Sequence, residues 1–78
     1  MKYEYARINR LGNVIVILRA DEKIYLEDAQ AFYFHFKVPI GIVNQGVLTD
    51  FFPKPYPLLF DRVGDLSRYE WKEIVLSL

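Results

Sequence analysis

Residues 29–46, AQAFYFHFKVPIGIVNQG, fit two kinds of secondary structure, and the choice between them sets the fold class. From Phe32 to Val38 aromatic residues alternate with more polar ones, which is the period of a half-buried strand. Helical spacing fits as well, because one side of such a helix would carry Leu26, Ala29, Tyr33 and Phe36. A strand here leads to a small barrel, whereas a helix leads to an α/β sandwich.

The residues at the start of this segment favour the helix. Asp28 is of a type that caps helices by accepting hydrogen bonds from first-turn amides, and Glu27 is favourable near the positive end of a helix. The Ala-Gln-Ala that follows forms helices better than strands. Pro39 pushes the residue before it out of the helical region. We therefore predict a helix over residues 28–37, with a strand as the alternative.

Four other segments have the composition of strands. Tyr3–Ile8 is rich in aromatic and β-branched residues, and the turn sequence NRLGN separates it from Val14–Leu18. Because Val14–Leu18 is apolar at every position, it predicts a strand buried on both faces at the centre of the sheet. Ile40–Val43 and Val47–Phe52 follow the helix and are separated by the turn NQG. The buried strand, the helix and the next strand predict a βαβ unit.

The C-terminal quarter predicts a loop and a second helix. The prolines of PKPYP, residues 53–57, cannot enter a central strand. Ser67 and Glu70 have the spacing of a capping box, and helical spacing continues through Trp71, Ile74, Val75 and Leu78. Residues 1–78 are therefore expected to form a single domain. The predicted fold is α/β, with a mixed central sheet and the order β-β-α-β-β-α.

Composition excludes several classes of site. The chain has no cysteine, so it has no disulfides and no thiolate metal ligands. Ten basic residues balance ten acidic ones, so no global field attracts DNA or anionic lipid. The N-terminus lacks the apolar core of a signal peptide, and no run reaches the roughly 18 apolar residues of a membrane span. We expect a cytoplasmic protein that does not enter a membrane.

Several short motifs appear in a recognisable order along residues 3–52. An acidic residue and Tyr-Ala on one strand, Glu4-Tyr5-Ala6, precede a glycine turn and an apolar strand; Gln30 follows on the helix, and VNQG ends the next strand. This order resembles the PD-(D/E)xK nuclease superfamily, in particular the N-terminal nuclease domain of type I restriction motor subunits. The resemblance implies a shortened restriction-endonuclease-like core.

The chain departs from this family at the positions that carry the chemistry. Glu4 stands where the resemblance places the first metal-binding aspartate. The family's Glu-x-Lys falls on Ile17-Leu18-Arg19, or on Leu18-Arg19-Ala20, and neither register offers a carboxylate. The tyrosine expected four residues after Gln30 is Phe34. The helix that precedes the first strand in the family is missing as well.

These departures weaken the case for phosphodiester hydrolysis. Such hydrolysis needs a hard cation held by carboxylates and a base that activates water. A leucine supplies no metal ligand, and the guanidinium of Arg19 remains protonated and cannot act as the base. Catalysis would survive only if Asp21 or Glu22 joined Glu4 in holding Mg²⁺, with Gln30 as a further site candidate. We expect no cofactor otherwise.

Three functions remain. The first is a catalytically inactive nuclease-like domain that binds DNA or a protein partner, the second is the metal-dependent nuclease, and the third is a purely structural oligomer. A basic patch around the first hairpin would serve DNA binding through Lys2, Arg7, Arg10, Arg19 and Lys23. Without the leading helix, Tyr3 and Tyr5 would lie exposed on one sheet face, and a second chain would cover them. We therefore predict a homodimer.

Overall fold

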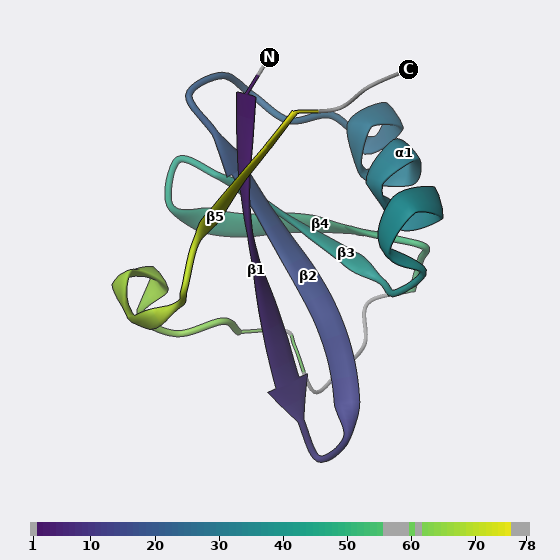
Figure 1. Ribbon diagram of the computed structural model, residues 1–78, viewed down its shortest axis with the longest axis vertical. Coiled ribbons are helices and arrows are strands. Elements are labelled where there is room, and N and C mark those ends of the chain that lie inside the picture. Colours follow the sequence, from purple (N-terminus) through teal and green to yellow (C-terminus); the bar gives the residue numbers. More distant parts are fainter. Residues whose placement is uncertain (1, 56–59, 61, 76–78) are drawn as a thin grey trace.

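Five strands form one mixed sheet with a single α-helix packed on one of its faces in the computed structural model, which describes residues 2–55, 60 and 62–75 (Figure 1). The helix is α1 (Leu26–Phe36), and the strands are β1 (Lys2–Arg10), β2 (Asn13–Ala20), β3 (Ile40–Asn44), β4 (Val47–Phe52) and β5 (Lys72–Val75). The strand order is β4-β3-β2-β1-β5. Neighbours are antiparallel except β2 and β3, which are parallel. The α/β class and the mixed sheet are confirmed.

Two tight turns have backbone conformations typical of β-hairpins, whose twist matches that of the flanking strands. Leu11 and Gly12 join β1 to β2 with φ angles of 53° and 81°, and Gln45 and Gly46 join β3 to β4 with 53° and 75°. Positive φ at both central residues is typical of a type I′ turn. The side chain of Asn9 accepts a hydrogen bond from Gly12 N–H at 3.1 Å. Both turns were predicted from their Asn and Gly residues.

The segment with two possible periods is helical, as predicted, but the helix begins earlier than expected. It starts at Leu26, with Tyr25 in extended conformation before it. Asp28 is therefore not the N-cap; it lies in the first turn, and its carboxylate accepts a hydrogen bond from Tyr25 N–H at 3.0 Å. Lys37 ends the helix in the left-handed conformation, and its N–H donates to Tyr33 O at 2.8 Å.

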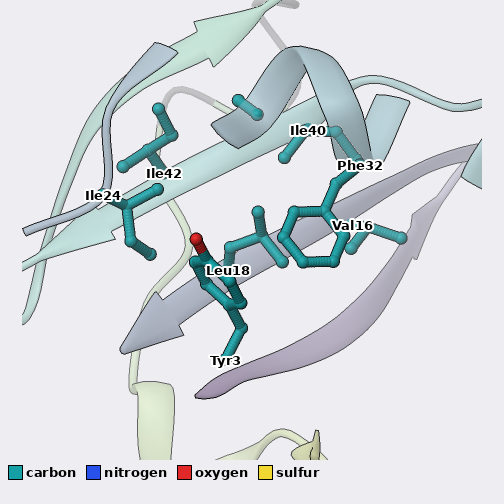
Figure 2. Close-up of a cluster of buried hydrophobic side chains, with 8 residues drawn as sticks. Tyr3, Val16, Leu18, Ile24, Phe32, Ile40 and Ile42 are labelled. Atoms are coloured by element: carbon teal, nitrogen blue, oxygen red, sulfur yellow. The ribbon is translucent and has the colours of Figure 1, made fainter. Parts of the chain in front are cut away.

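The face of the sheet beneath α1 holds the first hydrophobic core (Figure 2). Phe32 reaches from the helix onto the central strands, and its ring lies edge-on to that of Tyr3 with centroids 4.8 Å apart. The buried members of this core are Tyr3, Val16, Leu18, Ile24, Ala29, Phe32, Ile40 and Ile42. Tyr3 is only 4% exposed. The expectation that this face needs a second chain to cover it is wrong, because α1 already covers it.

The opposite face is covered by an irregular part of the chain. Phe60 and residues 62–71 lie over the sheet, and Phe60 and Val63 belong to a second core. The sheet residues of this core are Ala6, Ile8, Ile15, Ile17, Val43 and Phe51. Because β2 is buried on both sides, every residue from Ile15 to Leu18 is at most 1% exposed. This confirms its predicted place at the centre of the sheet.

The predicted C-terminal helix is wrong. Leu66–Arg68 is a short 3-10 helix, η2, whose N-cap is Asp65 rather than Ser67. Lys72–Val75 is instead a strand that pairs antiparallel with β1. Pairing with the open edge of β1 satisfies the backbone of these residues, and this tertiary term outweighs their helical spacing. Leu78 and residues 56–57 of the proline-rich loop lie outside the described residues.

Candidate functional site

The register of the first hairpin pairs the predicted metal ligand with an arginine. Glu4 on β1 lies directly across from Arg19 on β2. Arg19 Nε donates to Glu4 Oε1 at 3.1 Å, and Nη2 donates to Oε2 at 3.5 Å. Both side chains are partly exposed, Glu4 at 40% and Arg19 at 36%. The two-point contact aligns the planes of the carboxylate and the guanidinium.

Trp71 packs against the guanidinium of this ion pair. The guanidinium carbon of Arg19 lies 3.9 Å from the centroid of the indole ring, which is close for a cation–π contact. Trp71 Nε1 donates to Leu66 O at 2.8 Å, so the ring is held between η2 and the sheet. Nearby, Lys2 Nζ lies 3.4 Å from the carboxylate of Glu73. Glu4 and Glu73 are therefore each matched by a cation from the same chain.

This arrangement does not fit a metal ion. A guanidinium occupies one edge of the Glu4 carboxylate, and within the described ranges no three His, Asp or Glu side chains come together as a metal-binding group. Gln30 lies exposed on α1, on the other side of the sheet from Glu4, since Tyr3 and Tyr5 face the helix and Glu4 points the opposite way. The structure therefore does not bring these two candidates together.

The other two acidic candidates line a groove. Asp21 and Glu22 follow β2 directly and lie beside the end of β3, at the carboxyl ends of the two parallel strands and next to the first turn of α1. The groove has a volume of about 850 Å³. Ligands of open α/β sheets commonly bind at this edge. Sequence reasoning found the two carboxylates but not the groove, because its walls come from three segments.

Asn44 builds one wall of the groove. Its amide Nδ2 donates to Ile24 O at 3.1 Å, and its Oδ1 accepts from Ile24 N–H at 2.9 Å. This pair of hydrogen bonds fastens the loop before α1 to the end of β3. Nδ2 also lies 3.4 Å from Thr49 Oγ1 on β4. The sequence signal was a polar residue closing an apolar strand, which we interpreted only as part of a turn.

The groove is electronegative. Its lining includes four carboxylates and one ammonium group; the acids are Asp21, Glu22, Glu27 and Asp50, and the base is Lys23. Asp50 pairs with Lys54 at 3.6 Å, which leaves three acids against one base. Lys23 Nζ lies 5.0 Å from the centroid of the exposed Tyr25 ring. An anionic ligand would be repelled at this groove.

Beneath α1, burial raises the pKa of the Tyr3 hydroxyl. The negative charge of Asp28, a hydrogen bond with Asp28 and the charge of Glu22 raise that pKa further.

The five basic residues predicted to bind DNA contact different parts of the molecule. Arg19 and Lys2 pair with carboxylates, as described. Arg10 donates to Arg62 O at 2.7 Å on the face covered by Phe60 and residues 62–71, whereas Arg7 lies 5.6 Å from the Phe36 ring on the face covered by α1. Lys23 lies at the groove. The residues are therefore divided between both faces and one end of the sheet, rather than gathered in one patch.

Comparison of the chain with protein-family models, curated proteins and solved structures finds no match. The resemblance to PD-(D/E)xK nucleases stays a prediction from the sequence. Within the part of the chain that the structure describes, no helix has the length and apolar character needed to span a membrane.

Proposed function

We propose that this chain is a nuclease-like domain that does not hydrolyse phosphodiesters and that acts by binding a protein partner. The proposal rests above all on the ion pair between Glu4 and Arg19. A guanidinium with two contacts to the carboxylate occupies one of its edges and compensates its charge, which disfavours Mg²⁺, an ion that needs well-placed oxygen ligands. The side chain in the family's metal-binding position thus has a structural role in this chain.

The groove supports a protein partner in preference to DNA. Its lining combines apolar groups, such as Ile24 and Ile42, with carboxylates at Asp21 and Glu22. Phosphates would meet like charge at this surface, whereas the lysine and arginine side chains of an extended peptide would meet opposite charge. We propose that the groove binds a positively charged segment of the partner.

Hydrolysis is tested with supercoiled plasmid and single-stranded DNA in the presence of Mg²⁺ or Mn²⁺. We expect both substrates to stay intact with the wild-type chain. The matched variants are Glu4→Ala and Glu73→Ala, which remove neighbouring carboxylates on one sheet face. Cleavage that is lost in Glu4→Ala and retained in Glu73→Ala would overturn the proposal, and would favour a nuclease using Glu4 with Asp21 or Glu22.

Partner chemistry is tested by fluorescence anisotropy with two labelled peptides, one alternating lysine with alanine and one alternating glutamate with alanine. We expect only the lysine peptide to bind, with affinity that falls as salt is added. The double variant Asp21→Asn, Glu22→Gln should lose this binding, whereas Glu70→Gln, an exposed acid outside the groove, should keep it. Equal binding by the double variant would reject the groove as the site.

DNA binding is tested by retention of a labelled duplex at increasing salt. We expect no retention even at low ionic strength. Salt-dependent retention that decreases in the variants Arg7→Ala and Arg10→Ala would instead support DNA as the partner.

A further inference from the structure

Helix α1 presents an aromatic side chain to solvent on the face that points away from the sheet. Phe34 is 61% exposed, although most large apolar residues of the chain are buried. Its ring contacts Tyr33 with centroids 6.1 Å apart, and Tyr33 in turn contacts Phe52 of β4 at 5.5 Å. Phe34 therefore lies at the outer end of an aromatic row that begins in the sheet. A row of this kind is a typical anchor for association.

Charges of opposite sign lie at the two ends of the exposed stripe of α1 that carries Phe34. Glu27 lies in the first turn, and Ala31 and Phe34 follow it at spacings of four and three residues, on one side of the helix. Lys37, the C-cap, lies just past the last helical residue in left-handed conformation. About 15 Å of helix separates the two charged positions. Neither Glu27 nor Lys37 forms an ion pair within the described residues. The stripe is thus acidic at one end, apolar in the middle and basic at the other end.

We propose that this stripe binds a second copy of the chain, with the two α1 helices antiparallel across a two-fold axis that passes between Ala31 and Phe34. In that arrangement Glu27 of each chain faces Lys37 of the other, so both ends are attractive. Phe34 of each chain packs over the small Ala31 of its partner. A parallel arrangement would bring Glu27 against Glu27 and Lys37 against Lys37, and is therefore disfavoured.

This surface differs from the one that the sequence suggested for a dimer. Tyr3 and Tyr5 contact α1 in the same chain, so they do not need cover from a partner. The α1 stripe is a separate surface from the sheet faces. The proposal does not depend on the binding of a basic segment in the groove.

The test is sedimentation equilibrium from micromolar to millimolar protein. We expect the wild-type chain to change from one to two copies within this range, with a dissociation constant that rises with salt. Phe34→Glu should remain a single copy throughout. The matched control is Leu11→Ser, which replaces an 88% exposed apolar residue in the turn between β1 and β2 and should dimerise normally.

Charge exchange tests the antiparallel orientation. Glu27→Lys and Lys37→Glu should each weaken the dimer at least several-fold, because two attractive contacts become repulsive, and the double variant should recover the wild-type dissociation constant. Circular dichroism and urea denaturation confirm that each variant is folded. A wild-type chain that stays single at millimolar concentration, a Phe34→Glu dimer of wild-type affinity, or a dimer that strengthens with salt would each overturn the proposal.

Discussion

The two faces of the sheet are buried by different kinds of structure. On one face, an eleven-residue helix places Ala29 and Phe32 against the central strands. On the other, Phe60 and residues 62–71 cover the sheet with irregular segments and the short 3-10 helix η2, which are fixed by individual contacts such as that of Trp71 with Arg19. The backbone groups of a helix are hydrogen-bonded within the helix itself, so it covers a surface without needing further partners for them. An irregular cover depends on side chains for the same purpose, and side-chain substitutions should therefore affect the two faces differently.

The largest expected effect comes from removing one ring from each core. Phe32 and Phe60 are 0% and 1% exposed. We expect Phe32→Ala to lower the free energy of unfolding by about 3–5 kcal/mol, because the helix holds the cavity open, and Phe60→Ala to lower it by about 2–3 kcal/mol, because a loop can relax into the space. Urea denaturation followed by circular dichroism measures both. A larger loss for Phe60→Ala would contradict the comparison.

The next effect concerns the contact that fixes the irregular cover. Trp71→Ala removes the cation–π contact with Arg19 and the hydrogen bond to Leu66 O. We expect the free energy of unfolding to fall by about 2 kcal/mol, since the ring is only partly buried. Trp71→Phe keeps a ring without the N–H donor and should recover roughly half of the loss. Denaturation followed by tyrosine fluorescence provides the measurement for both variants.

A smaller effect on the helix-covered face depends on pH. Because burial and the nearby charges of Asp28 and Glu22 raise the pKa of the Tyr3 hydroxyl above its ordinary value near 10, the folded chain retains this proton where the unfolded chain loses it. This contribution to stability is present below pH 10 and is lost as the pH rises through the folded-state pKa. Tyr3→Phe should show a shallower alkaline loss of stability than the wild type, measured by urea denaturation between pH 8 and 11.5. Equal slopes would contradict this assignment.

The smallest effect separates the observed C-terminal structure from the helix that the sequence suggests. In a capping box Glu70 would contribute to helix stability, but here it is an exposed residue between η2 and β5. Glu70→Ala should therefore change the free energy of unfolding by less than about 0.5 kcal/mol. Asp65→Ala should cost more, because the Asp65 carboxylate accepts hydrogen bonds from both Ser67 N–H and Ser67 Oγ. Thermal denaturation of the two variants decides their order.

Local sequence patterns were sufficient to predict the elements that depend mainly on interactions between residues close together in the chain. The apolar run in β2, the two Asn- and Gly-containing turns and the helix before Pro39 all appear close to their predicted positions. The same reasoning failed at Lys72–Val75, since Ile74 and its neighbours have a spacing that suits a helix as well as a strand. For the candidate site, the sequence identified Glu4, Arg19, Asp21 and Glu22 as the residues of interest. It did not indicate that the first two neutralise each other.

The sequence by itself determined the buried central strand, the turns and the helix, because each depends on the residue types of one short segment. Only the tertiary structure decided which residues meet. The antiparallel register places Arg19 opposite Glu4, the parallel ends of β2 and β3 bring Asp21 and Glu22 beside Asn44, and the open edge of β1 makes a strand of Lys72–Val75. Such pairings join residues far apart in the chain, and their free energy is therefore absent from any local pattern.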